Sequence, residues 1–247
     1  MSNVCLTPKE TSEALIESAQ KKVAMTVKKR YIMSIMAGLY ISLGAQGFMV
    51  TYDNLFIRAA VFPVGLMLIV LVGGELFTGN CLMTFALLHK KITFKDYMSS
   101  LLQVLIGNLI GALVAVGFLY FGGIYNNPAM AETVVNIANS KLSLSFTEAL
   151  FKGILCNVLV SLGVWFATTS KDTTGKILGC WFPIMLFVLC GYEHVVANMF
   201  YLPMAMIVDS AITISEVVLD NFIPVAIGNF IGGGILVPIM YYRVYYK

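Results

Sequence analysis

Long apolar runs without a single charge constrain this chain more than any other feature. Residues 61–74, 101–123 and 155–168 contain no Asp, Glu, Lys or Arg, and only 12% of the 247 residues are charged. A soluble domain carries about 25% charged residues, whereas a membrane-spanning helix needs roughly 20 consecutive apolar residues. The sequence therefore predicts an all-α integral membrane protein.

The apolar pattern predicts six transmembrane helices, of which the second and the fifth are interrupted. They cover about 31–51, 59–88, 98–121, 148–169, 176–206 and 222–242. No cleavable signal peptide is expected, because the first 30 residues are polar and basic and the first long apolar run starts at Tyr31. Little chain remains for a soluble catalytic domain, and no hydrolase, zinc-protease or nucleotide-binding motif is present. We expect neither an enzyme nor a cofactor or metal site.

The basic residues predict the orientation in the membrane. All but three of the sixteen Lys and Arg precede the first span or follow the second, fourth and sixth spans. The exceptions are Arg58, Lys141 and Lys152. Because positive charge is retained in the cytoplasm, both termini are expected inside, in a cytoplasmic membrane of prokaryotic type. The net charge of +3 then does not indicate nucleic-acid binding.

The N-terminal 28 residues are predicted to form a cytoplasmic amphipathic helix, before a channel domain at 29–247. Thr7-Pro8-Lys9-Glu10 has the pattern of a capping box with proline at the first helical position. One face of this helix would carry Leu15, Ala19, Val23 and Val27. The helix could be a membrane-surface anchor or a lid over a pore mouth, and Lys9 is a candidate for anion attraction or gating.

Two halves of the membrane region repeat each other at an offset of 118 to 121 residues, over about 31–121 and 148–242. The matching segments are Ser42-Leu43-Gly44 with Ser161-Leu162-Gly163, Phe62-Pro63 with Phe182-Pro183, and Ile106-Gly107-Asn108 with Ile227-Gly228-Asn229. Because each copy holds three spans, the second copy is predicted to be inverted relative to the first. Inverted repeats with interrupted helices are typical of transport proteins.

The interrupted segments at 73–80 and 191–198 share the pattern Glu-x-x-x-small-Asn. A helix break exposes backbone groups that lipid cannot satisfy, so it is tolerated only inside protein or beside a water-filled cavity. Four polar residues are therefore expected to support these breaks: Glu75, Asn80, Glu193 and Asn198. His194 and Thr78 differ between the copies and are the better candidates for a role in permeation.

The roles of His194 and Lys141 stay open at this point. His194 is the single histidine near the membrane midplane and could brace the break or line a pore; ionisable groups at this depth favour the pore. Lys141 falls in the segment 122–147, read as an extracellular loop, where it could draw anions toward the pore or simply be solvated.

Several of these motifs together resemble the formate/nitrite transporter family over all six spans. They are the segments Gly73 to Gly79, Gly153 to Asn157, Tyr192 to His194, Ala197 to Phe200 and Pro203 to Ala205. The resemblance implies a homopentamer of aquaporin-like protomers, each with its own pore. It also implies transport of small monovalent weak-acid anions such as formate, nitrite or hydrosulfide.

The resemblance also implies roles for individual residues. Thr78 would lie on the loop that interrupts the second span and His194 at the pore centre, with Asn157, Asn198 and Asn229 near the path. Two hydrophobic constrictions would contain Phe62, Leu66, Leu76, Val160 and Phe187. Thr78-Gly79-Asn80 resembles the nitrite and hydrosulfide members more than the formate members, whereas Ser161-Leu162-Gly163 departs from the family pattern.

These features lead to one functional hypothesis and two alternatives. Moving a bare anion into a dry constriction costs several kcal/mol even after relaxation. The anion is therefore expected to gain a proton, near His194 or from water, and to pass as the neutral acid. A channel for water or small neutral solutes would need no histidine. A membrane anchor for a soluble enzyme would need cofactor ligands or a docking tail, and the sequence offers neither.

Overall fold

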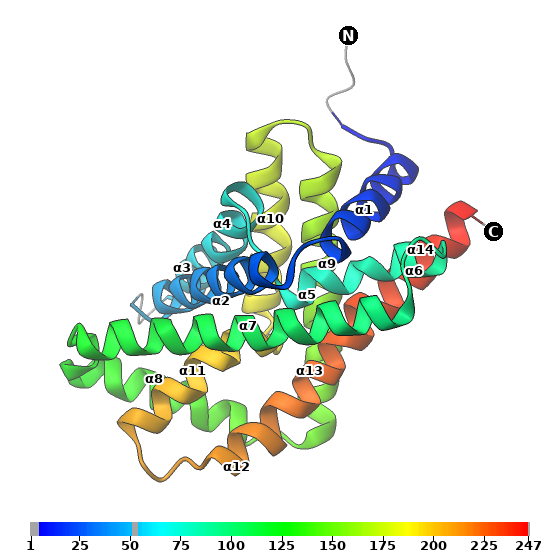
Figure 1. Ribbon diagram of the computed structural model, residues 1–247. Helices are drawn as coiled ribbons and strands as arrows, with labels where there is room; N and C mark the ends of the chain where they lie inside the picture. The colour runs from blue at the N-terminus through cyan, green and yellow to red at the C-terminus, as the bar shows by residue number, and fades with distance from the viewer. Residues whose placement is uncertain (1–4, 51–53, 247) are drawn as a thin grey trace.

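The computed structural model describes residues 5–50 and 54–246, and within these ranges the chain is helical (Figure 1). The one β pairing among them is an isolated antiparallel bridge between Cys5 and Ser170. The first half contains α1 (Pro8–Val23), α2 (Val27–Val50), α3 (Leu55–Val61), α4 (Val64–Val72), α5 (Phe77–Asn80), α6 (Thr84–Leu88) and α7 (Phe94–Phe121).

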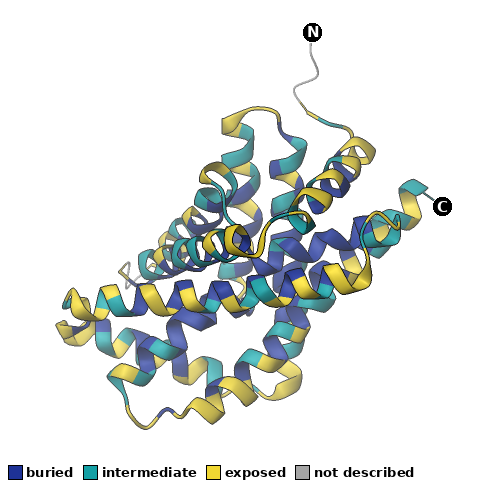
Figure 2. Cartoon of the chain, viewed as in Figure 1, coloured by how far each residue is buried: buried dark blue, intermediate teal, exposed yellow. Residues whose placement is uncertain are grey.

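The second half continues with α8 (Pro128–Leu142), α9 (Phe146–Thr169), α10 (Thr173–Leu189), α11 (Val195–Val208), α12 (Ile214–Glu216), α13 (Ile223–Phe230) and α14 (Val237–Tyr246). Two π-helical segments, 217–222 and 231–236, join α12, α13 and α14 into one continuous rod. Buried residues gather where the helices cross, and exposed residues cover their outer faces (Figure 2).

Within the described ranges, five helical segments are long and apolar enough to cross a membrane: Val27–Val50, Leu55–Val72, Phe94–Phe121, Phe146–Thr169 and Ile214–Tyr246. The fifth predicted span, 176–206, consists instead of the two shorter helices α10 and α11. Helix length and composition alone therefore give five spans, not the six that the sequence predicts. The reason is the interruption itself, which divides this segment into pieces too short to span.

Both predicted interruptions are present, and a glycine lies at each. Gly73, at the end of α4, has φ = 107°, and Gly191, after α10, has φ = 65°. These left-handed values favour glycine because it lacks a Cβ atom. Pro183 and Pro203, by contrast, lie inside α10 and α11 without ending them. The backbone turn is therefore made by the glycines and not by the prolines.

The segment 122–147 is not a loop, which corrects the sequence interpretation. It contains α8, which Asn127 caps with its side chain and which has proline in its first turn. Met130, Val134 and Ala138 recur every fourth residue and are buried. The polar residues of this segment occupy the opposite side of a surface helix, and their number concealed the helical period.

Helix α1 begins with the predicted capping box. Glu10 accepts a hydrogen bond from the Thr7 amide at 2.7 Å, and the Thr7 hydroxyl accepts one from the Glu10 amide at 3.3 Å. The Thr7 amide and the Thr7 hydroxyl both donate to the Glu10 carboxylate, and these two bonds lower the pKa of Glu10. The helix ends at Val23. Val27, which the sequence analysis assigned to the apolar face of this helix, is the first residue of α2.

Helix α1 is attached to the rest of the chain near its first turns. The hydroxyl groups of Thr11 and Thr169 lie 3.0 Å apart, and those of Ser12 and Tyr246 lie 2.7 Å apart. The start of α1 is thereby tied to the end of α9 and to the end of α14, and both chain ends emerge on the same side of the molecule (Figure 1).

Glycines allow the two halves to repeat the same close helix packing. A Cβ atom on Gly111 of α7 would clash with the Ile35 carbonyl oxygen of α2. A Cβ atom on Gly232 would clash in the same way with the Ile154 carbonyl oxygen of α9. Ile35 and Ile154 are 119 residues apart, so the packing contact follows the sequence repeat. Such small-residue contacts are a common way for membrane helices to approach closely.

Gly111→Ala is expected to destabilise the protein by about 1–3 kcal/mol, because the added methyl group forces α2 and α7 apart. The matched control is Gly117→Ala on the same helix, where an added Cβ atom meets nothing within 4 Å. Thermal unfolding in detergent measures both variants. Equal midpoints for the two would contradict the packing argument.

Candidate functional site

Two cavities reach toward the helix breaks from different sides. The first, the α8 cavity, has a volume of about 490 Å³ and is lined by α8 together with the ends of α2, α3, α9 and α10 and the start of α11. The second, the α1 cavity, has a volume of about 290 Å³ and is lined by α1, α4, α5, the end of α9 and the break at Gly73. The two cavities thus approach the two interrupted segments.

Each break has a lysine that pairs with its glutamate. At the break of the α8 cavity, Lys141 Nζ lies 3.0 Å from both carboxylate oxygens of Glu193. At the other break, Lys22 Nζ lies 2.8 Å from both carboxylate oxygens of Glu75. Within residues 5–50 and 54–246 these are the two ion pairs of the chain. Each glutamate is therefore neutralised where the helix is broken.

An asparagine completes each of these ion pairs. Asn80 donates to Glu75 at 2.7 Å and accepts from Lys22 at 2.8 Å. Asn198 donates to Glu193 at 2.6 Å and also contacts Asn221 at 2.7 Å. The four repeat-related polar residues are thus joined to each other, in two equivalent clusters.

Sequence analysis missed Lys22, although a signal for it existed. Lys22 and Lys141 are separated by 119 residues, the same offset as the internal repeat. The two lysines lie outside the spans, on α1 and α8, so the comparison of membrane segments did not include them. The repeat therefore extends to the helices that cover the cavities.

Two further asparagines hold the broken backbone in place. Asn108 of α7 accepts from the Phe77 amide at 2.9 Å and donates to the carbonyl oxygens of Ser34 at 2.8 Å and Glu75 at 2.9 Å. This satisfies an amide at the start of α5, which has no helical partner. The sequence repeat contained Asn108, but its role was not recognised.

Asn229 of α13 makes the equivalent three bonds in the second half. It accepts from the Val195 amide at 2.9 Å and donates to the carbonyl oxygens of Gly153 at 2.8 Å and Glu193 at 2.9 Å. We had expected Asn229 near the path because of the resemblance. The structure places it behind the break, where it satisfies backbone groups and lines neither cavity.

Thr78 and His194 are in contact at the breaks; His194 lines the α8 cavity, whereas Thr78 lines neither cavity. Their side chains belong to different halves, and Thr78 Oγ1 lies 3.0 Å from His194 Nε2. Thr78 is fully buried and His194 is 3% exposed, with the imidazole among the groups lining the α8 cavity. The two residues that differ between the copies are therefore brought into direct contact.

The hydrogen bonds of His194 determine its tautomer. Nδ1 accepts a hydrogen bond from the Ala197 amide at 3.1 Å and caps α11. An accepting Nδ1 carries no proton, so in the neutral ring the hydrogen lies on Nε2 and points to Thr78. A proton on Nδ1 would face the Ala197 amide hydrogen and break the cap. The imidazole is thus arranged as a neutral donor.

Four of the five predicted constriction residues line the cavities. Phe62 and Phe187 line the α8 cavity with ring centroids 5.6 Å apart and planes at 83°, and Phe187 stacks on His194 at 5.8 Å. Leu66 and Leu76 line the α1 cavity. The fifth, Val160 of α9, is 1% exposed and lines neither cavity.

Two other predicted site residues lie away from the cavities. Asn157 of α9 donates to the carbonyl oxygens of Thr78 at 3.2 Å and Asn229 at 2.6 Å, which places it behind the Thr78 break. Lys9 Nζ lies 5.9 Å above the ring of Tyr246 and lines neither cavity. In the described part of the chain, no group of three or more His, Cys, Asp or Glu residues could hold a metal ion.

Comparison with known proteins agrees with this arrangement. The family model described as "Formate/nitrite transporter" matches residues 9–243. The chain is 40% identical over 251 residues to an uncharacterised transporter of Bacillus subtilis, YrhG, covering 97% of this chain and 94% of that protein. It is 39% identical over 251 residues to the formate channel BtFdhC of Bacillus thuringiensis, covering 97% and 96%.

Solved structures with the same fold include an FNT family ion channel, with a TM-score of 0.88, 26% identity and coverage of 95% of this chain and 98% of that one. A pentameric formate channel with formate bound matches with a TM-score of 0.79 and 27% identity, covering 90% and 98%. An aquaglyceroporin from Plasmodium falciparum matches with a TM-score of 0.52 and 16% identity over 88% and 96%, which shows a related fold.

Asn229→Ala is expected to destabilise the protein by about 1–3 kcal/mol for each buried backbone group that it leaves unpaired. Asn139→Ala is the matched control, because Asn139 is exposed on α8. Chemical unfolding in mild detergent, followed by tryptophan fluorescence, compares the variants. Similar stability of the two would show that Asn229 does not support the break.

Proposed function

Because the chain belongs to the formate/nitrite transporter family, we propose that it is a membrane channel for small monovalent weak-acid anions. Formate is the first candidate, since the relatives and the solved structure reported above include formate channels. The preference for hydrosulfide or nitrite suggested by Thr78-Gly79-Asn80 stays a prediction. The pentameric formate channel, which shares 27% identity, supports a homopentamer of this chain in the bilayer.

We propose that the protomer crosses the membrane six times, in two inverted halves. The spans would be α2, α3 with α4 to α6, and α7, followed by α9, α10 with α11, and α12 with α13 and α14. The matching contacts of Asn108 and Asn229 support this arrangement. Residues 1–28 would cover the cytoplasmic side, and 29–247 would form the channel domain.

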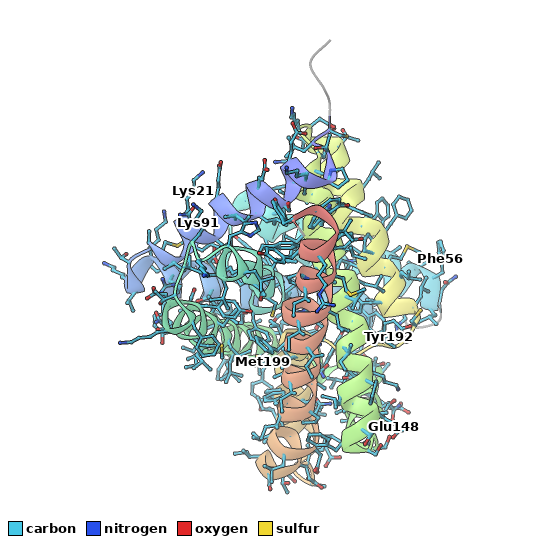
Figure 3. All side chains as sticks on the ribbon, turned by 90° about the vertical axis from the view of Figure 1, so that its right-hand side faces the viewer. Lys21, Phe56, Lys91, Glu148, Tyr192 and Met199 are labelled. Carbon is cyan, nitrogen blue, oxygen red and sulfur yellow. The ribbon has the colours of Figure 1, made fainter. Side chains whose placement is uncertain are left out.

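The charge distribution supports an orientation for the two cavities. Lys21 and Lys91 lie toward one end of the molecule. Glu148, in the first turn of α9, lies toward the opposite end (Figure 3). With positive charge retained inside, the α1 cavity opens to the cytoplasm together with both termini. The α8 cavity then opens to the outside of a cytoplasmic membrane.

The proposed path leads from the α8 cavity past Phe62 and Phe187 to the Thr78–His194 contact, and then past Leu66 and Leu76 into the α1 cavity. Val160 would support this path from behind. Glu75, Glu193, Asn80 and Asn198 hold the broken helices, together with Lys22 and Lys141. Lys141 would thus act chiefly through Glu193, because its ammonium group is already paired.

The tautomer of His194 supports water as the source of the proton. A neutral imidazole with hydrogen on Nε2 donates a hydrogen bond to an arriving anion, but loses its own proton only at great cost. The anion would therefore be held by His194 Nε2–H and Thr78 and gain a proton that the water in the cavity relays from the external solution, so that no hydroxide is left behind. The neutral acid then passes the apolar residues without the several kcal/mol that desolvation of a charge costs.

Proteoliposome flux at a series of pH values tests this function. Formate, nitrite, hydrosulfide, lactate and glycerol are compared, with empty liposomes as the control. We expect uptake of at least one weak-acid anion that rises as the external pH falls, because protonation then becomes more frequent. Glycerol or water flux without pH dependence would favour the neutral-solute channel instead.

His194→Asn is expected to slow transport about tenfold or more while the acid stimulation remains, because the amide replaces a hydrogen-bond donor and not the proton source. His89→Asn is the matched control, since the other histidine lines neither cavity and donates from Nδ1 to the Phe85 carbonyl oxygen at 2.8 Å. Stopped-flow uptake between about pH 5 and 8 measures both. Loss of the acid stimulation in His194→Asn alone would make the imidazole the proton donor.

A further inference from the structure

The α8 cavity holds more positive charge than its ion pair requires. Among the described residues that line it are three basic side chains, Arg58, Lys141 and Lys152, and one carboxylate, Glu193. Lys141 is bound to both oxygens of Glu193 and contributes no free charge. Arg58 and Lys152 remain, and neither forms an ion pair with a described residue. Among the described residues that line it, the α8 cavity therefore has a surplus of two positive charges.

Arg58 is held in a fixed position with donors left over. Its Nε donates to the Phe48 carbonyl oxygen at 3.1 Å, and its guanidinium carbon lies 4.1 Å from the centre of the Phe48 ring. No described residue accepts from its two terminal nitrogens. An arginine that is stacked and anchored in this way loses little freedom when it binds a carboxylate.

Lys152 occupies a position where the two repeats differ in charge. Its carbonyl oxygen accepts from the Glu193 amide at 3.3 Å, and the Met33 carbonyl oxygen accepts from the Glu75 amide at 3.1 Å. Lys152 and Met33 are thus equivalent, 119 residues apart, and each lines the cavity of its own half. Glu148, four residues before Lys152, is bound to Ser145 in a capping box; its charge attracts that of Lys152 from a distance, but no ion pair joins the two.

The α1 cavity lacks this surplus. Lys22 is the basic residue among its described lining groups and is bound to Glu75. At the offset of 120 residues that relates Phe62 to Phe182, the counterpart of Arg58 is Leu178 of α10, which carries no charge and is not among the residues that line the α1 cavity. The shared Lys–Glu–Asn clusters are therefore neutral structural elements, whereas Arg58 and Lys152 are additions in one cavity alone.

From this difference we infer that Arg58 and Lys152 form an anion-docking site in the α8 cavity, separate from the Thr78–His194 contact. The site takes small carboxylates and binds dianions such as oxalate more tightly than formate, because two positive charges act on the ligand. This inference rests on the proposed function, in which formate leaves the site by protonation. A dianion needs two protons to become neutral, so it stays and blocks the entrance.

The test uses Lys152→Met, which copies the residue of the other repeat, Arg58→Gln, and the double variant. Lys171→Met is the charge-matched control, because Lys171 is exposed and lines neither cavity. Lys152→Arg keeps the charge and serves as the rescue variant. Size-exclusion chromatography checks that every variant keeps the elution position of the wild-type protein.

Formate uptake is measured in oriented proteoliposomes, with formate added on the α8 side or on the α1 side. We expect each single substitution to raise the half-saturating concentration on the α8 side by roughly threefold to tenfold at low salt. The α1 side and the Lys171→Met control should not change. The difference should disappear in about 1 M salt, where the Debye length falls to about 3 Å.

Binding of oxalate to the purified protein, measured by calorimetry, tests the site without transport. We expect oxalate to bind more tightly than formate, and to lose roughly tenfold or more in affinity in the double variant. Equal affinities for wild type and double variant, or equal changes on both sides of the membrane, would overturn the inference. Absence of formate flux in the wild-type protein would instead overturn the proposed function, while the oxalate measurement would still decide on the docking site.

Discussion

The fold depends on satisfying the backbone at two helix breaks inside an apolar protein. Phe77 and Val195 begin short helices, and their amides have no helical acceptor. An unpaired amide at membrane depth costs several kcal/mol, so the breaks require polar side chains from elsewhere. Asn108 and Asn229 provide one acceptor and two donors each, which matches the groups that the breaks expose. The surrounding helices are therefore arranged as much around these asparagines as around the apolar core.

The charged groups near the breaks follow the same constraint. Glu75 and Glu193 are each about 4% exposed and would be costly if unpaired. Lys22 and Lys141 neutralise them from helices that lie over the cavities, α1 and α8, and not from the spans. The covering helices are thus linked to the breaks by ion pairs. Each pair is neutral as a whole, so a passing solute meets no net charge from it.

Much of the architecture could be predicted, because the lengths of the apolar runs and the residues that interrupt helices are local properties of the sequence. The shared Glu-x-x-x-small-Asn pattern at 73–80 and 191–198 indicated the two breaks, and the repeat offset indicated the equivalent residues. The helix α8 and the role of Lys22 were missed because both depend on tertiary contacts. A polar surface helix has the composition of a loop. The role of Lys22 could be found only by following the repeat beyond the spans, to its counterpart Lys141. Asn157 and Asn229 were expected near the path, and their place on it stays a prediction; that they bond carbonyl oxygens and an amide at the breaks depends on tertiary contacts that the sequence does not show.

The duplication explains which positions are free to acquire new chemistry. A residue that satisfies a break is fixed in both halves, because its loss leaves backbone groups unpaired; this applies to the pairs Asn108/Asn229 and Glu75/Glu193. A residue that uses only its backbone at the break can change its side chain without that cost. Lys152 and Met33 make the same carbonyl contact, so one can be charged and the other apolar. His194 is a mixed case, since its ring caps α11 while its second nitrogen reaches Thr78. Structural symmetry of the backbone is thus compatible with two chemically different cavities.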